Sequence, residues 1–426
     1  MSTADLRPHD PYAALRLPEF RRLISARACF VLATRIQGLV VSWQILHLTN
    51  DPLALGFIGL AEAVPSIGVS LYAGHVADTV RRKNIVVAMV ALLLLCAAAL
   101  WALASPMGRP LLAREVFYTL PLYGVIFLSG IARGFLGPAL FAFMPQLLPD
   151  RSVLPNAITW NSTTWQASSV VGPALGGYLI KFVGVTNSYA VATGLLTLAL
   201  LQFVSIKGRP LPERVGEQLK LGASILSGLR FIFSNQLVLS ALALDMFAVL
   251  FGGAVALLPI YAVDILKVGA DGLGHLEAAP AVGSVLMAVA LTYFPLRHKA
   301  GQKLLWAVAG FGLATILFAV STNFVLSLFL LFMTGVFDSV SVIVRSTLIH
   351  TFTPEHMKGR VSAVNNIFIG SSNELGAFES GAMARLLGTV RSVVFGGTMT
   401  ILVVGITAAL APRLRRLHDV KEEAAA

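Results

Sequence analysis

Stretches of about twenty apolar residues recur from one end of this chain to the other. Each stretch is long enough to cross the hydrocarbon core of a bilayer, roughly 30 Å thick, as a helix. Only 12% of the 426 residues are charged, about half the share expected of a soluble domain. No sustained alternation of apolar and polar residues is found, which disfavours a β-barrel. The sequence therefore predicts an all-α integral membrane protein.

The breaks between the apolar stretches predict twelve transmembrane helices in two six-helix bundles related by a pseudo-two-fold axis. The predicted helices are 21–48, 52–77, 84–104, 117–147, 153–182 and 185–206, then 236–263, 271–295, 301–321, 323–350, 357–387 and 391–411. The predicted units are a cytosolic leader (1–20), an N-terminal bundle (21–206), a cytosolic linker (207–221), a C-terminal bundle (222–412) and a cytosolic tail (413–426). A short amphipathic segment around 222–235 precedes the second bundle.

Positive charge is concentrated in alternate connections. About 22 Lys and Arg residues fall in the leader, the linker, the tail and the connections on the same side, against about six on the other side. This asymmetry is the positive-inside pattern, so we expect both termini in the cytosol, with no signal peptide. The net charge of +11 thus reports orientation, and we expect no nucleic-acid partner. Cys29 and Cys96 lie in apolar stretches and are expected to be core residues.

One ten-residue pattern, G-x-x-E-x-x-P-x-x-G, occurs twice. It runs from Gly59 to Gly68 around Glu62 and from Gly274 to Gly283 around Glu277, an offset of 215 positions. Further matches at an offset of 205 are Gly130 with Gly335, Asn161 with Asn366, and Gly176 with Gly381. The chain therefore reads as a parallel repeat of two six-helix halves, an arrangement that places a substrate site near the midplane between them.

Glu62 and Glu277 are the predicted proton carriers. A charge inside a bilayer is costly, and burial disfavours the charged form of a carboxylate, so protonation there is cheap. Two alternatives stay open: each glutamate pairs with an arginine and locks helices together, or each contacts the substrate directly. Pro65 and Pro280 each follow a glutamate by three residues and are expected to bend the helix.

Several other polar groups fall near the middle of predicted helices. Because so many charges are unsuited to a lipid-facing position, we expect them to line a watery cavity or to pair with one another. The predicted cavity or substrate residues are Arg35, Arg133, Asp338, Asn366, Glu374 and Glu379, and Asp245 is a third predicted proton-coupling residue.

Three short motifs resemble signatures of the major facilitator superfamily, and one of them, Arg133-Gly134 followed by Gly137, does so in part. The segment from Gly74 through Asp78 to Arg82 and Lys83 is similar to its loop signature G-x-x-x-D-x-x-G-R-R/K, with Arg81 in place of the second glycine. Gly172-Pro173-Ala-Leu-Gly176-Gly177 is similar to the G-P-x-x-G-G core of its antiporter signature. The segment from Thr353 to Asn366 resembles the bacterial enterobactin (siderophore) exporter branch.

The resemblance implies roles for these motifs. Gly74, Asp78 and Arg82 would hold the cytosolic side closed when the cavity opens outward, although the basic residues there also set topology. Gly172, Pro173, Gly176 and Gly177 would let helices approach closely and, secondarily, support antiport. By the same resemblance, Arg35 and Asp245 would line the cavity on the first and seventh helices, as a pair that breaks during rocking or as a static buried pair.

These observations predict a secondary transporter that works by alternating access in a bacterial inner membrane. We expect a monomeric proton-coupled exporter (antiporter) of a small amphipathic molecule such as a siderophore, a drug or a lipid-related metabolite. An importer of the same fold and a non-transporting receptor or scaffold are the alternatives. The sequence lacks a G-x-x-x-x-G-K-[ST] motif, metal-ligand spacing and a nucleophile elbow, so we expect no enzyme activity and no cofactor.

Overall fold

The computed structural model describes residues 10–108, 119–209, 221–294, 299–354 and 357–417. Every regular element in these ranges is helical. The predicted leader is described from residue 10 onward, whereas most of the predicted linker and tail falls outside the described residues, as does the loop 109–118. The predicted boundaries of those three segments therefore stay predictions.

Five long helices form the first half of the molecule. They are α1 (Pro18–Thr49), α2 (Pro52–Thr79), α3 (Arg82–Ala104), α5 (Leu120–Phe143) and α6 (Leu154–Ser205), with short 3-10 turns η1 (Ala14–Arg16), η2 (Met144–Leu147) and η3 (Arg151–Val153). The 52 residues of α6 would extend about 78 Å at 1.5 Å per residue, more than twice a bilayer. The backbone turns back at Gly184, whose φ of 79° favours glycine, so α6 consists of two antiparallel helices.

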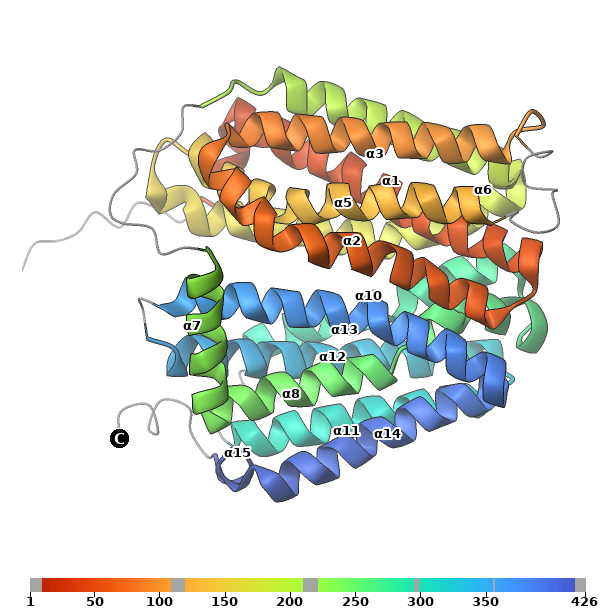
Figure 1. Cartoon of the computed structure of the whole chain (residues 1–426), viewed down its shortest axis with the longest axis vertical. Helices are drawn as coiled ribbons and strands as arrows, with labels where there is room; N and C mark the ends of the chain where they lie inside the picture. Colours follow the sequence, from red (N-terminus) through yellow and green to blue (C-terminus); the bar gives the residue numbers. More distant parts are fainter. Residues whose placement is uncertain (1–9, 109–118, 210–220, 295–298, 355–356, 418–426) are drawn as a thin grey trace, which may run out of the picture.

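The second half contains the remaining helices. They are α7 (Leu221–Ser234), α8 (Gln236–Phe251), η4 (Ala254–Leu257), α9 (Leu258–Ile260), η5 (Tyr261–Ile265), α10 (Gly269–Tyr293), α11 (Ala300–Val320), α12 (Phe324–Phe352), α13 (Lys358–Leu387), α14 (Thr389–Leu410) and α15 (Pro412–Arg416). In Figure 1 the helices of the first half lie above those of the second, and α7 runs across the left-hand ends of its neighbours.

Ten of the described helices are long and apolar enough to cross a membrane. These ten include α6 once and do not include α13, a 30-residue helix that carries Glu374 and Glu379. Counting both arms of α6 and adding α13 gives the twelve crossings that the sequence predicts. The prediction of an all-α membrane protein is confirmed, and the crossing of α13 remains an inference from its length and position.

The prediction of one continuous helix over 236–263 is wrong. Helix α8 ends at Phe251, and Gly252 and Gly253 separate it from the short elements that follow. A Cβ on Gly253 would lie 2.7 Å from the carbonyl oxygen of Gly376 in α13, and one on Gly252 would lie 2.6 Å from the ring of Phe311 in α11. Because glycine has no Cβ, α11 and α13 can approach the backbone closely where the helix is interrupted. The apolar pattern of the sequence does not reveal this interruption.

Corresponding glycines make corresponding contacts in the two halves. A Cβ on Gly130 would lie 2.8 Å from the ring of Pro65, and a Cβ on Gly335 would overlap the carbonyl of Pro280. The turn between α13 and α14 is made by Gly388 with φ of 89°, matching Gly184 in the first half. The duplication read from the sequence therefore extends to the helix crossings.

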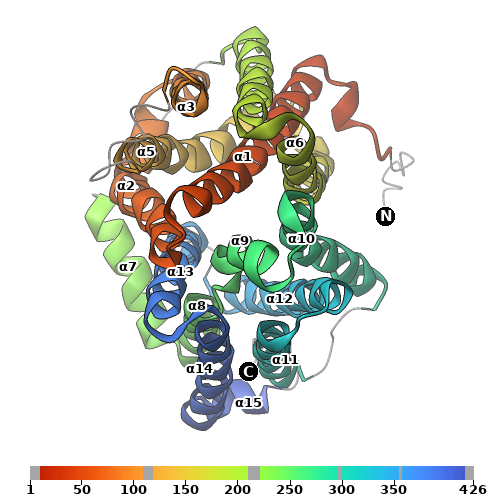
Figure 2. The same cartoon turned by 90° about the vertical axis from the view of Figure 1, so that its right-hand side faces the viewer.

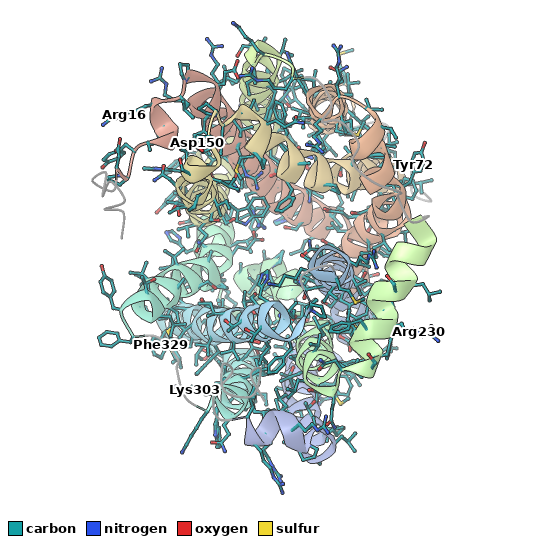
Figure 3. All side chains as sticks on the ribbon, turned by 90° about the vertical axis from the view of Figure 1, so that its left-hand side faces the viewer. Arg16, Tyr72, Asp150, Arg230, Lys303 and Phe329 are labelled. Atoms are coloured by element: carbon teal, nitrogen blue, oxygen red, sulfur yellow. The ribbon has the colours of Figure 1, made fainter. Side chains whose placement is uncertain are left out.

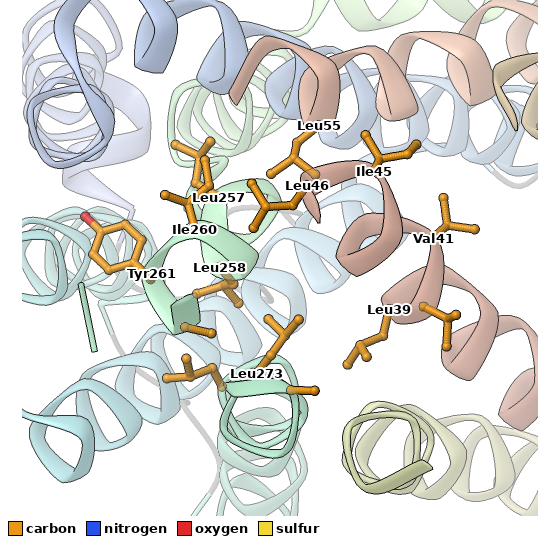
Figure 4. Packing of buried hydrophobic residues seen from close by; sticks show 14 of the residues in the cluster. Leu39, Val41, Ile45, Leu46, Leu55, Leu257, Leu258, Ile260, Tyr261 and Leu273 are labelled. Atoms are coloured by element: carbon orange, nitrogen blue, oxygen red, sulfur yellow. The ribbon is translucent and has the colours of Figure 1, made fainter. Parts of the chain in front are cut away.

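Among the described residues, the two halves share a hydrophobic core at one end (Figure 4) and not at the other. The shared core joins the ends of α1 and α2 to the segment around α9 and to α10, and includes Leu39, Val41, Ile45, Leu46, Leu55, Leu257, Leu258, Ile260 and Leu273. At the other end the buried clusters are separate, and each draws its residues from one half. We call these the closed end and the open end; α7 and α15 lie at the open end, on the left of Figure 1.

Two ion pairs also connect the halves at the closed end. Asp51, which caps α2, pairs with Arg385 of α13 at 3.1 Å, and Lys181 of α6 pairs with Asp271 of α10 at 2.8 Å. In each pair the carboxylate lies at the start of a helix that carries the repeated glutamate motif. Figure 2 views this end, with α1, α9 and α10 near its centre. The closed end is thus held by an apolar core and two peripheral charge pairs.

Candidate functional site

Five charged residues from five helices converge midway along the molecule. Arg35 of α1 interacts electrostatically with Glu62, Arg133, Glu277 and Glu374, which lie on α2, α5, α10 and α13. The first half contributes both arginines and one glutamate, and the second half contributes two glutamates. We call these five residues the central cluster. The structure thus brings together five of the residues that the sequence singled out.

Within the first half, Arg133 forms an ion pair with Glu62. Glu374 faces this pair from the second half and interacts electrostatically with both members, repelling Glu62 and attracting Arg133. The approach is close because α2 and α13 cross at Gly59, where a Cβ would lie 2.6 Å from the carbonyl oxygen of Glu374. Two carboxylates therefore compete for one arginine across the interface between the halves.

Glu277 occupies a different environment from its counterpart Glu62. It is half-buried and forms no ion pair with any described cation, and Arg35 is the cation that acts on it across the interface. Glu62 and Glu277 therefore occupy equivalent positions in the two halves, but only Glu62 forms an ion pair with a described residue. For Glu62 the structure favours the arginine-pairing alternative in this conformation, whereas Glu277 is left without a direct partner among the described residues.

Asp245 pairs with Arg345 inside the second half. The two residues are 6% and 4% exposed and lie on α8 and α12. The predicted pair between Arg35 and Asp245 is therefore not formed in this structure. Asp245 instead forms a buried pair with Arg345, which lies on a neighbouring helix of its own half and was not predicted as its partner.

The other predicted cavity residues lie on α12 and α13. Asp338 and Glu379 are half-buried, and Asn366 is exposed. The hydroxyl of Ser380 donates to one oxygen of Glu379 at 3.5 Å, while the other oxygen is buried without a partner. An uncompensated buried carboxylate oxygen is costly, so the described residues satisfy Glu379 only in part.

The glycine motif of α6 forms two helix crossings. Gly172 and Gly176 pack on α1, where a Cβ on Gly176 would lie 3.4 Å from the Cα of Ile36. Gly177 packs on the other half, at the start of α10 and close to Gly274. Gly274 itself packs against the carbonyl of Pro173. The motif therefore holds α6 against its own bundle with one face and against the opposite bundle with another.

The predicted gate motif lies at the open end. Gly74 and Asp78 belong to α2, but the surroundings of Gly74 and the side chain of Asp78 are outside what the structure describes. Arg82 begins α3 and donates from Nη1 to the carbonyl of Ala142 at 3.0 Å, which connects α3 to the end of α5. The predicted gate role of Asp78 is therefore untested.

Sequence reasoning did not select Arg27 or Trp165. The guanidinium carbons of Arg27 and Arg35, both on α1, lie 5.6 and 5.5 Å from the centroid of the Trp165 ring of α6. A cation at this range is attracted by the π face of the ring. The two arginines lie eight residues apart on α1, a spacing that places them on the same face of the helix and could have been recognised in the sequence. Their contact with Trp165 depends on the tertiary packing of α1 and α6.

At least two cavities among the described residues lie outside the central cluster. One, of about 630 Å³, is lined at the closed end by residues that include Trp43, His47 and Thr186. The other, of about 560 Å³, is an apolar groove between α6, α10 and α12. Figure 3 looks onto the open end, where Arg16 and Asp150 of the first half lie above Arg230 and Lys303 of the second.

Comparison with known families decides the class of protein. The family model described as Major Facilitator Superfamily matches residues 23–377. The chain belongs to the major facilitator superfamily. It is therefore a multi-pass membrane transporter for small molecules and not an enzyme, as the sequence predicts. The superfamily's loop and glycine signatures were sufficient to indicate this membership before the fold was known.

Among curated proteins, this superfamily member is similar to the enterobactin exporters EntS of Shigella boydii and Escherichia coli. Each alignment is 28% identical and covers 96% of this chain and 95% of the relative. The resemblance to the siderophore-exporter branch is thereby supported along nearly the whole chain.

Solved structures share the fold at low sequence identity. A POT family transporter in complex with 5-aminolevulinic acid superposes with a TM-score of 0.72 at 10% identity, covering 93% of this chain and 96% of that chain. A bacterial homologue of the human lysosomal transporter Spinster, in an inward-facing and unoccupied conformation, gives 0.67 at 14% identity, with 93% and 96% covered. The nucleoside transporter NupG gives 0.68 at 12% identity, with 93% and 98% covered.

Proposed function

We propose that this transporter is a proton-coupled exporter of a small amphipathic molecule. The observation that carries the proposal is the pair Glu277 and Glu374, two half-buried carboxylates in the central cluster without an ion-pair partner among the described residues. Membrane-embedded carboxylates of this kind mark proton or substrate pathways. The similarity to exporters along 96% of the chain favours outward transport.

The proposed coupling is a competition between proton and substrate. A deprotonated carboxylate accepts a hydrogen bond or binds a cationic group of the substrate, and protonation removes that interaction. Protons from outside would thus displace substrate into the medium, and deprotonation on the cytosolic side would restore the site. Glu62 is held by Arg133 in this conformation, and we propose that Glu374 takes over that arginine when the halves move.

The proposed orientation places the open end in the cytosol of a bacterial cell, in the inner membrane. The concentration of Lys and Arg in the connections at that end supports it. The structure would then represent the state that loads substrate from the cytosol, with the shared core closing the outer side. In the proposed cycle, the two bundles (21–206 and 222–412) rock about the central cluster in a monomer, and Asp78 closes the cytosolic side in the opposite state.

Glu277→Gln and Glu374→Gln are each expected to uncouple proton movement from transport. In sealed liposomes with an imposed pH gradient, wild type should show proton movement that depends on an added substrate, drawn from a panel of catecholate siderophores, cationic dyes and lysolipids. Loss of the titrating group should reduce that movement at least about tenfold, as expected for removing one essential proton-transfer group.

Glu19→Gln is the matched control, because Glu19 pairs with Arg209 at the open end and lies outside the central cluster. This variant should keep wild-type coupling. Undiminished substrate-dependent proton movement in both Glu277→Gln and Glu374→Gln would rule out the proposed carriers.

A further inference from the structure

Arg27 and Arg35 differ from the other arginines in the interior of the molecule. Arg133 and Arg345 each pair with a carboxylate, whereas neither Arg27 nor Arg35 forms an ion pair with a described carboxylate. The Nε of Arg27 is buried without a hydrogen-bond partner. An unpaired cation inside a membrane protein is costly. The carboxylates of the central cluster act on Arg35 without a direct contact, and no described carboxylate pairs with Arg27, so an acidic group of a bound molecule would offset the charge of Arg27.

Trp165 holds the two guanidinium groups in one place. The arginines lie eight residues apart on α1, about 12 Å along the helix axis at 1.5 Å per residue. Both nevertheless lie within 5.6 Å of the same ring centroid. Their side chains therefore converge on Trp165 and present two cations around one point, which a π face stabilises without neutralising their charge.

This point is open to solvent. Arg35 is exposed, Trp165 is 42% exposed, and both lie at midheight or toward the open end, where the two halves have separate cores. Across the interface, Glu277 and Glu374 of the second half act on Arg35. The first half thus presents unpaired cations and the second half presents unpaired carboxylates, so the two walls have opposite charge.

We propose that Arg27, Arg35 and Trp165 form a subsite that binds an acidic group of the transported molecule, such as a carboxylate or a phenolate. Guanidinium groups bind oxyanions through charge-assisted hydrogen bonds, and two of them fit a group with several acidic oxygens. The opposite wall takes a hydrogen-bond donor or a cationic group. The substrate class is therefore an amphipathic molecule with an acidic group at one end and a donor group at the other. The inference rests on the proposed function only in that the molecule passes through this site.

The test is a binding measurement that needs no proton gradient. Five tryptophans are present, and replacing Trp43, Trp101, Trp160 and Trp306 by Phe leaves Trp165 as the only one. The probes are 4-nitrobenzoate and its neutral analogue 4-nitrobenzyl alcohol, because the nitroaromatic ring of each quenches tryptophan fluorescence. Half-maximal quenching by the anion is expected at a concentration at least about tenfold lower than by the alcohol, as for one charge-assisted contact.

Arg27→Gln/Arg35→Gln should abolish the preference for the anion, and Arg27→Lys/Arg35→Lys should retain part of it because the charge remains. Arg391→Gln, on the exposed start of α14, is the matched control and should behave as the parent protein. Elution as a single monodisperse peak establishes that each variant is folded. Equal quenching by both probes in the parent, or an unchanged preference in the double Gln variant, would overturn the subsite. Proton coupling could fail independently without altering this result.

Discussion

Asp245→Asn is expected to lower the stability of the transporter by about 3–5 kcal/mol, because it leaves the buried guanidinium of Arg345 without its counter-charge. Both side chains are nearly inaccessible, with exposed fractions of 7% and 5%. Arg345→Met should be as damaging, since it leaves the Asp245 carboxylate unpaired. The measurement is the thermal unfolding midpoint of the purified protein in detergent.

The double variant Asp245→Leu/Arg345→Met is the decisive comparison. Replacing a buried ion pair by apolar residues of similar volume is often neutral or stabilising, so the double variant should be more stable than either single variant. Asp51→Asn is the control for an exposed pair, where the expected cost is about 0–1 kcal/mol. Single variants as stable as wild type would mean that Asp245 and Arg345 are not paired in the folded protein.

Leu258→Asn is expected to open the closed end without unfolding the protein. Leu258 is fully buried in the shared core, and its helix α9 packs against α1 of the other half. Burying an unsatisfied amide costs about 1–3 kcal/mol, and losing a buried leucine costs a further 1.5–3 kcal/mol or so. A conformation in which the two halves separate at this end avoids both costs, and every 1.4 kcal/mol shifts the equilibrium about tenfold.

The reporter for opening is Ile45→Cys, a fully buried position of α1 in the same core, in a background with Cys29 and Cys96 replaced by Ala. Labelling by a polar maleimide in detergent should be at least about tenfold faster with Leu258→Asn. Leu304→Asn is the matched control, because Leu304 is buried in a cluster confined to the second half. It should lower thermal stability without faster labelling. Equal acceleration by both variants would show that general loosening, and not separation of the halves, exposes Ile45.

The helices were predictable because hydropathy and turn residues act locally. The predicted segment 301–321 corresponds to α11 at Ala300–Val320, and 52–77 corresponds to α2 at Pro52–Thr79. The left-handed turns at Gly184 and Gly388 could also have been found, since they fall at nearly the same offset as the other repeated glycines. The break at Gly252 had one local signal, the dipeptide Gly252-Gly253, but the apolar residues on both sides favoured a continuous helix, and the close contacts of these glycines with α11 and α13 depend on tertiary packing.

Charge pairing was less predictable than charge position. The central location of Arg35, Glu62, Arg133, Glu277 and Glu374 followed from helix arithmetic, and the structure brings these residues together. Which arginine pairs with Asp245 depends on helix rotation and on which helices are neighbours. The convergence of Arg27 and Arg35 on Trp165 also depends on which helices pack together. The two long side chains span the two turns of α1 between them and meet at an aromatic ring of α6.

We expect the two halves to alternate between closure at one end and closure at the other, under control of Glu277 and Glu374. The most direct measurement is the distance between spin labels by pulsed electron paramagnetic resonance. One label pair is placed at the open end on exposed positions Val204 and Leu410, and a second pair at the closed end on Leu120 and Val390. Because Glu374 is proposed to take over Arg133 when the halves move, Glu277→Gln/Glu374→Gln, which mimics the protonated state, should favour the present conformation, with a longer first distance and a shorter second distance than in wild type. Distances that stay fixed at both ends, or that change in the same direction, would contradict the account.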